Sequence, residues 1–481
     1  MAGIIPSFRK CLVIGLSSSL LALPALAAEK VCAQGNCESS WKNATQADIK
    51  AATDLGEDYK TFLQSARTEL STVIEAVKLL KRNGFVEWHG ERIKAGKRYY
   101  RVNRDRALFV MIGGRNSIET GVRIAVSHID SPRIELKGRP LQKKEGFAMF
   151  QTNYHGGLKP WQWTNIPLAL LGRVDKKNGE TVQISIGLNP DEPVFIIPGL
   201  SPHIARSQRA AKGADIVPYE SLDPIVASGP DGDIDVVDRV LAYLKDTYNI
   251  EAADLVSAEL ALVPAMPPRD IGFDRRLIAA YGQDDKVSAY TSLVAAINSK
   301  NLPQTSIIFL ADNEETGSGN VTGAKSTALT DLIGEMLYAE VGDKYRQPML
   351  TKALRASKAL SADVNPGVNP MKPSAWELSN APRLGYGVNI KRYGRGFNAN
   401  SEFIAWTRAA LDTGNVPWQT TTYKVGVGGG GTLGGFIAYH NIDTIDFGVP
   451  VLSIHTPYAI SDKMDVLALS RAFQVFLEYS R

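Results

Sequence analysis

The apolar residues in the second half of the chain fall into short continuous runs that alternate with segments of helical periodicity. A short continuous apolar run is typical of a strand that is buried on both faces. The strand-like runs are 258–265, 305–311, 358–364 and 443–454, and the helical segments are 285–299, 401–412 and 465–479. Strands that alternate with helices predict an α/β sandwich with helices on both faces of a sheet.

The first half of the chain begins in the same way and then changes character. Helical periodicity covers 45–82, and strand-like runs follow at 106–114 and 121–130. The segment 140–257 is instead rich in proline and glycine, with one helical stretch at 236–248. Its short β-like runs include 181–188 and 192–200. These patterns predict one α/β domain, made of 28–139 and 258–481, and a mainly β domain inserted at 140–257.

The N-terminus has the pattern of a secretory signal peptide. Arg9 and Lys10 precede an apolar stretch, which ends in a small-residue cleavage site at Ala25 and Ala27. We expect residues 1–27 to be removed and the mature protein to be periplasmic or secreted. No later stretch of the sequence is apolar for long enough to span a bilayer, so no membrane association is expected after cleavage.

The composition excludes some partners and some kinds of site. Hydrophobic residues make up 44% of the 481 residues, which suits globular domains, and a net charge of +4 does not indicate a nucleic-acid partner. Cys32 and Cys37 remain after removal of the signal. They could form a small disulfide in an oxidising compartment, a pairing that the sequence leaves open. A thiolate zinc site is excluded because no partner cysteines exist.

Histidines and carboxylates stand at the ends of the expected strands and at the start of one helix. They are His128, Asp130, Asp284, Asp285, Asp312, Glu314, Glu315, Asp363 and His455. Ligands in open α/β sheets bind outside the carboxyl ends of the strands, so we expect these side chains to gather at one site. Alone, either histidine would favour a hydrogen-bonded core residue, and the two glutamates a surface turn. Together the set favours a metal centre.

The types of residue indicate which metal and which chemistry. Two imidazoles with several carboxylates suit Zn²⁺, and there are more carboxylates than one catalytic zinc uses. Two zinc ions bridged by a carboxylate would use them. Neighbouring side chains on extended backbone point in opposite directions, so one of Glu314 and Glu315 could bind metal while the other acts as general base.

Several long motifs carry a resemblance to a known family. They are SHIDSPRIELKGRP, YHGGLKPWQWTNIPLALLGRV, YGQDDKVSAYTSL, DNEETGS, SADVNPGVNP, GGGGTLGG and GVPVLSIHTP. In this order they resemble the aspartyl aminopeptidase family, also called aminopeptidase I-type zinc peptidases, and in particular its bacterial branch. The resemblance covers the chain from about Thr45 to the C-terminus. It implies an α/β/α zinc-peptidase domain whose inserted domain mediates dimerisation.

The resemblance also implies a role for each site residue. One zinc would be held by His128 and Asp363, the other by Glu315 and His455, with Asp284 bridging them, Glu314 as general base, Asp130 orienting His128, and His203 inserted into the active site of a neighbouring subunit. Asp285 would help to shape the turn. His155 inherits no ligand role, so we expect it to be structural.

The predicted function is a zinc aminopeptidase that removes N-terminal residues from peptides, in dimers that assemble into twelve chains. The alternative is another co-catalytic zinc amidohydrolase, such as a deacylase, on the same scaffold. A non-enzymatic oligomer with a decayed site is disfavoured by the intact ligand set. The family's best-known substrates have acidic N-terminal residues, for which a cation would be needed. Lys391 and Arg392 lie near the expected place, but the residue preference stays open.

Overall fold

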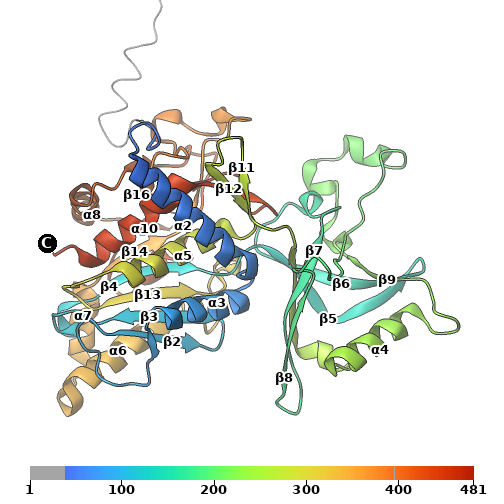
Figure 1. Ribbon diagram of the computed structural model, residues 1–481, viewed down its shortest axis with the longest axis horizontal. Helices are drawn as coiled ribbons and strands as arrows, with labels where there is room; N and C mark the ends of the chain where they lie inside the picture. Colours follow the sequence, from blue (N-terminus) through green and yellow to red (C-terminus); the bar gives the residue numbers. More distant parts are fainter. Residues whose placement is uncertain (1–37, 395, 481) are drawn as a thin grey trace, which may run out of the picture.

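The computed structural model describes residues 38–394 and 396–480, which form two parts joined side by side (Figure 1). The predicted signal peptide, 1–27, and both Cys32 and Cys37 lie outside the described residues, so cleavage, export and the disulfide stay predictions. Among the described residues, no helix is both long enough and apolar enough to cross a membrane.

The larger part is built on a nine-stranded sheet with the order β1-β2-β3-β13-β4-β14-β20-β16-β19. Its strands are β1 (Val86–Glu87), β2 (Arg98–Asn103), β3 (Ala107–Ile112), β4 (Arg123–His128), β13 (Ser306–Ala311), β14 (Lys358–Ala362), β16 (Val388–Lys391), β19 (Trp418–Thr421) and β20 (Asp443–Gly448). The four neighbours β13, β4, β14 and β20 are parallel. Their carboxyl ends therefore open at one edge of the sheet.

Helices cover both faces of this sheet, which confirms the predicted α/β/α sandwich (Figure 1). One face carries α2 (Gln46–Ser65), α3 (Glu69–Arg82), α5 (Gln283–Asn298), α8 (Ser401–Thr413) and α10 (Lys463–Glu478). The other face carries α6 (Ala328–Val341), α7 (Gln347–Ala356) and α9 (Gly434–Ala438). Alternate side chains of the central strands pack into the two layers; Ile308 lies in one core and Phe309 in the other.

The helical stretch expected at 45–82 is two helices, because α2 ends at Ser65 and α3 begins at Glu69. Thr68 caps α3: its side chain accepts the Ser71 N–H, and the Ser71 side chain accepts the Thr68 N–H. In the turn between them Arg67 is fully buried and donates to the carbonyls of Pro264 and Met266. The polar turn is thus stabilised by bonds that a continuous helix would not make.

The smaller part is a six-stranded antiparallel sheet with the order β8-β7-β10-β5-β6-β9, and α4 (Val236–Tyr248) packs on it (Figure 1). Its strands are β5 (Arg133–Lys144), β6 (Phe147–His155), β7 (Leu168–Asp175), β8 (Thr181–Ile186), β9 (Ile225–Ser228) and β10 (Ala258–Pro264). The sheet extends beyond the predicted range 140–257 at both ends, since β5 begins at Arg133 and β10 ends at Pro264. These two strands, by which the chain enters and leaves the sheet, pair with each other. The β-like run 192–200 forms only isolated bridges, at Phe195 and Ile196.

Small sheets complete the edge at which the parallel strands end. Strands β11 (Arg269–Ile271), β12 (Leu277–Ala280) and β22 (Ala459–Asp462) form one of them. The run expected at 443–454 divides into β20 and β21 (Pro450–Val451), and β21 pairs with β15 (Asn365–Pro366). Strand β12 leads into α5, and the loop between β21 and β22 carries His455. These small sheets therefore position the start of α5 and the loop of His455 at this edge.

Candidate metal centre

The carboxyl edge of the parallel strands gathers the predicted metal ligands and the predicted base in one place. His128 is the last residue of β4, Asp363 follows β14, and Glu314 and Glu315 form a 3-10 turn after β13. Asp284 enters at the start of α5, where the peptide bond to Asp285 is cis. The site is therefore assembled from segments more than 300 residues apart in the sequence.

The two carboxylate oxygens of Asp284 face different histidines. Its Oδ1 lies 3.0 Å from His128 Nε2, and its Oδ2 lies 3.2 Å from His455 Nε2. Asp363 Oδ1 lies 3.7 Å from His128 Nε2, and Glu315 Oε2 lies 3.2 Å from His455 Nε2. By these distances, Asp284 lies between His128 and His455, with Asp363 on the side of His128 and Glu315 on the side of His455.

Two sets of residues could each hold a metal ion, because the possible ligand atoms within each set lie within 4.8 Å of one another. The first set is His128, Asp284 and Glu315, and the second is His128, Asp285 and Asp363. The second set includes Asp285, which the sequence suggested only as a turn residue. Its Oδ1 accepts from Ser288, but its Oδ2 is buried without a hydrogen-bond partner in the described chain, as is Oε1 of Glu315. Buried carboxylate oxygens without donors are suited to a cation.

The site holds several buried carboxylates whose mutual repulsion a positive charge would relieve. Burial is the main cause that raises the pKa of Glu314 to about 8, and the charges of Asp363 and Glu315 add to it, although His128 opposes it. Burial and the charge of Asp284 also raise the pKa of both Glu315 and Asp363. A bound divalent cation would offset this repulsion between buried carboxylates.

Asp130 is the fully buried anchor of the site. Its Oδ1 accepts the Glu314 N–H at 3.0 Å, and its Oδ2 accepts the Glu315 N–H at 3.1 Å. The Asp130 carbonyl lies 3.0 Å from His128 Nδ1, and its Oδ1 lies 3.2 Å from the same nitrogen. Because Nδ1 then carries the proton, Nε2 of a neutral His128 is unprotonated, and it offers its lone pair to a metal ion on the side of Asp284.

Unusual backbone conformations and close packing position His455, Glu315 and Asp284 in the site. His455 has φ 63°, in the left-handed region that non-glycine residues rarely adopt. At Gly156 (φ +73°) an added Cβ would lie 3.0 Å from Glu315 Cβ, so glycine is needed there. Behind Asp284, the buried Lys286 Nζ donates to Ser131 Oγ at 2.7 Å, and Ser131 donates to the Asp284 carbonyl at 2.5 Å.

His203 does not reach this cluster within its own chain. It is exposed in the loop between β8 and β9, and its N–H donates to Ser201 Oγ at 3.3 Å. Of the two candidate cations, Lys391 is buried opposite Asp446 and lies 5.3 Å from the Tyr423 ring centre, whereas Arg392 is exposed.

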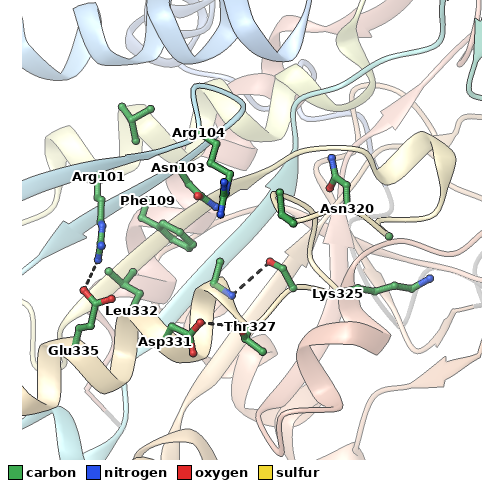
Figure 2. Close-up of a pocket in the computed structure, with 15 residues that line it drawn as sticks. Arg101, Asn103, Arg104, Phe109, Asn320, Lys325, Thr327, Asp331, Leu332 and Glu335 are labelled. Carbon is green, nitrogen blue, oxygen red and sulfur yellow. Dashed lines mark hydrogen bonds and ion pairs between the residues drawn. The ribbon is translucent and has the colours of Figure 1, made fainter. Parts of the chain in front are cut away.

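A cavity of about 700 Å³ lies apart from the predicted ligands (Figure 2). It is bordered by the end of β2, the loop after Gly319 and the start of α6. In it Arg101 pairs with Glu335, and Thr327 donates to Asp331 at 2.7 Å. None of the predicted metal ligands lines this cavity, so its size does not identify it as the reaction site.

Sequence reasoning did not find the part that His155 plays. Its Nε2 lies 2.8 Å from Asp130 Oδ2, and its Nδ1 lies 3.3 Å from Glu135 Oε1. The histidine stands at the end of β6, in the YHGG motif. Its position in this motif is the only sequence signal, and the contact with Asp130 depends on the tertiary fold.

Comparison with known proteins identifies the family of the chain. Residues 62–477 match the family model of the aminopeptidase I zinc metalloproteases (M18). A probable M18 family aminopeptidase 1 from Borrelia garinii subsp. bavariensis is 37% identical over 453 residues, which cover 91% of this chain and 99% of that protein. The corresponding protein of Clostridium acetobutylicum is 35% identical over 456 residues, covering 92% of this chain and 98% of the other.

Solved structures show the same fold. The M18 aminopeptidase of Thermotoga maritima superposes with a TM-score of 0.86 at 35% identity, covering 92% of this chain and 99% of that chain. Aminopeptidase I from Clostridium acetobutylicum gives a TM-score of 0.84 at 34% identity, covering 92% and 98%. The chain therefore belongs to the aminopeptidase I family of zinc metalloproteases, M18.

Proposed function

We propose that the protein is an exported aminopeptidase that works with two zinc ions and uses Glu314 as its general base. The observation that carries the proposal is the orientation of Asp284, whose Oδ1 and Oδ2 each face a different histidine. A carboxylate in this orientation can bridge two metal ions.

The distances support a proposed assignment of the other ligands. His128 and Asp363 would hold one zinc together with Asp284, since both lie on the Oδ1 side. His455 and Glu315 would hold the other on the Oδ2 side. The nitrogen and oxygen donors fit Zn²⁺, and the unpartnered Glu315 Oε1 adds a free oxygen. Asp285 lies within reach of the same zinc as His128 and Asp363 and has a buried Oδ2 without a partner, but Ser288 holds its Oδ1, and the assignment gives it the role of balancing charge.

Zinc at this site would supply a Lewis acid that activates water and polarises the peptide carbonyl. Glu314 would accept the proton of the attacking water and deliver it to the leaving amine. Burial raises the pKa of Glu314, which favours uptake of a proton, and bound zinc would lower it again, which favours the release of that proton. Asp130 holds the Glu314 backbone in place through the bond to its N–H.

Two glutamate substitutions test this assignment. Glu314→Gln should keep both zinc ions and lower kcat by about 10²–10⁴-fold, the usual contribution of a general base. Glu315→Gln should instead reduce the zinc content, and Glu335→Gln, which removes an exposed carboxylate paired with Arg101, serves as the control. Zinc is measured by elemental analysis, and kcat with aminoacyl anilides. Near-normal turnover of Glu314→Gln would remove it as the base, and a single zinc at full activity would refute the two-metal mechanism.

The same kinetic assay distinguishes an aminopeptidase from a deacylase and measures which N-terminal residue is preferred. Hydrolysis of N-acyl amino acids, but not of aminoacyl anilides, would make the protein a deacylase. If the preference is for acidic N-terminal residues, we expect Lys391 rather than Arg392 to hold the side chain, because only Lys391 points into the buried layer. A panel of Asp, Glu, Lys, Leu and Ala substrates, compared between the wild type and Lys391→Met, decides this.

The proposal includes assembly through the loop that carries His203. Leu200 and Ile204, on either side of it, are 54% and 70% exposed, so this loop offers an apolar surface to another subunit. A yeast relative of the same fold, at 21% identity, has been solved as a dodecamer. We expect dimers that build a similar assembly, and light scattering on the purified protein measures the mass.

A shared active site makes a second expectation. His203→Ala should lower turnover and leave the zinc content unchanged. Co-expression with Glu314→Gln chains should restore part of the activity, because an intact metal site can then meet an intact histidine. A fully active monomer, or His203→Ala of normal rate, would exclude the contribution of a neighbour.

Export is supported by the pattern at the N-terminus alone. N-terminal sequencing of the protein from its native host should find a chain that begins close to Ala28, in the periplasm or medium. A cytoplasmic chain that begins at Met1 would contradict both export and a disulfide between Cys32 and Cys37.

A further inference from the structure

We infer that His155, at the end of strand β6, is a positioning residue that holds the metal centre through Asp130. The inference rests on the zinc site proposed above and goes beyond it, because none of the proposed ligands comes from the six-stranded sheet. It gives this sheet a direct part in the geometry of the site.

The contacts form a short chain from the sheet to the two glutamates. His155 Nε2 donates to Asp130 Oδ2 at 2.8 Å, and the same Asp130 oxygen accepts the Glu315 N–H at 3.1 Å. The other Asp130 oxygen accepts the Glu314 N–H at 3.0 Å. The His155 side chain is only 6% exposed and Asp130 is fully buried, so water does not replace the bond. If the Asp130 carboxylate rotated, it would displace both Glu314 and Glu315, because it accepts the backbone N–H of each.

His155 is itself fixed from the far side. Its Nδ1 lies 3.3 Å from Glu135 Oε1, and Glu135 pairs with Arg133 at 2.8 Å. Arg133 also contacts Glu69 of α3 at 2.9 Å. Carboxylates only accept hydrogen bonds and one faces each ring nitrogen, so the contacts favour the protonated ring. Burial opposes that charge, but the bonds to Asp130 and Glu135 raise the pKa of His155 to about 9.

The two residues that follow touch the site as well. An added Cβ at Gly156 would lie 3.0 Å from Glu315 Cβ, and one at Gly157 would lie 3.4 Å from His455 Nδ1. The end of β6 therefore lies against Asp130, Glu315 and His455. An aromatic ring at position 155 without N–H donors would keep the packing of β6 against the site. Such a substitution would remove only the hydrogen bonds of His155.

The experiment compares three substitutions in the full-length mature protein. His155→Phe removes both donors, His155→Gln keeps one N–H donor, and His89→Phe alters an exposed histidine as the control. We measure zinc release into an excess of a chromogenic chelator, and kcat and KM at saturating zinc. His155→Phe should release zinc about 10–100-fold faster and lose kcat by a similar factor, the usual effect of removing a group that orients a ligand. KM should change little, and His155→Gln should recover most of the loss.

Each outcome decides the inference. Zinc release and kcat of His155→Phe within twofold of the His89→Phe control would overturn it, as would a His155→Gln protein no better than His155→Phe. If His155→Phe does not fold, Glu135→Met takes its place because a methionine side chain gives His155 Nδ1 no oxygen to bond, and unchanged zinc release in that variant would overturn the inference. A wild type that binds no zinc would refute the proposed function instead, whereas a zinc-loaded active wild type with an unaffected His155→Phe refutes only this inference.

Discussion

Replacing Asp270 by asparagine should destabilise the larger part of the molecule by about 2–3 kcal/mol. Asp270 lies on β11, and its Oδ1 accepts from Lys60 of α2 at 2.7 Å and from Lys463 of α10 at 2.9 Å. The Lys463 side chain is only 2% exposed. The carboxylate thus neutralises two ammonium groups that hold two helices to the small sheet.

The magnitude follows from what remains after the substitution. Removing one partner of a buried ion pair costs about 3–5 kcal/mol, because the other charge stays buried. Both lysines keep a second carboxylate, Glu57, which lies 2.9 Å from Lys60 and 3.1 Å from Lys463. Glu57 is half-exposed and weaker as a partner, so it reduces the loss without removing it.

Urea unfolding at fixed zinc concentration measures the effect as a lower midpoint at unchanged slope. Asp274→Asn is the matched control, since the Asp274 carboxylate is 60% exposed and lies 3.6 Å from Arg276; it should change stability by less than about 0.5 kcal/mol. Equal midpoints for Asp270→Asn and Asp274→Asn would show that the ion cluster does not stabilise the fold.

Acid should remove the difference between wild type and Asp270→Asn. Burial would raise the pKa of Asp270, but the bonds from Lys60, Lys463 and Arg275 lower it well below its usual value of 3.8. A carboxylate with a lowered folded-state pKa contributes stability that is present above the unfolded value and is lost as the pH falls through the folded value. The difference should therefore be constant from pH 7 to about pH 5 and shrink below about pH 4.

Three further results are expected. Phe473→Ala, which empties a fully buried position of α10 against the sheet, should lower the free energy of unfolding by about 3–5 kcal/mol in urea, and a loss below 1 kcal/mol would contradict the described core. Thr45→Ala removes the side chain that caps α2 and should cost about 1 kcal/mol; no change would mean that this end frays in solution. Removal of zinc by a chelator should lower the melting temperature, and added zinc should restore it, because a ligand that binds the folded state stabilises it; equal melting temperatures would argue against a buried zinc site.

The gathering of the candidate ligands could be predicted from sequence because a simple topological rule places them. Strands β13, β4 and β14 are parallel neighbours, so residues that follow them must meet at one edge. The rule needs no knowledge of side-chain contacts. It places His128, Glu315 and Asp363 together although they are far apart in the sequence.

Other features depend on contacts that a linear pattern does not contain. The expected helix 45–82 is interrupted where Arg67 bonds to the carbonyls of Pro264 and Met266, and His155 becomes a partner of Asp130 only when β6 reaches the site. Helix α6 is a different case. Its buried residues are Leu329, Leu332, Ile333, Met336 and Leu337, whose helical spacing is present in the sequence and would have predicted it.

The pairing of the entry and exit strands of the six-stranded sheet has a consequence for how the chain folds. Ala261 lies opposite Glu135, so about 130 residues begin and end side by side. Closing a loop of that length costs roughly 3 kcal/mol more entropy than closing one of about five residues, on a (3/2)RT ln n scale. Hydrogen-exchange labelling during refolding should then protect β7 and β10 before β4 and β13. Once the inserted sheet has formed, it acts as a short linker, and the two halves of the larger part can assemble as if they were neighbours in sequence.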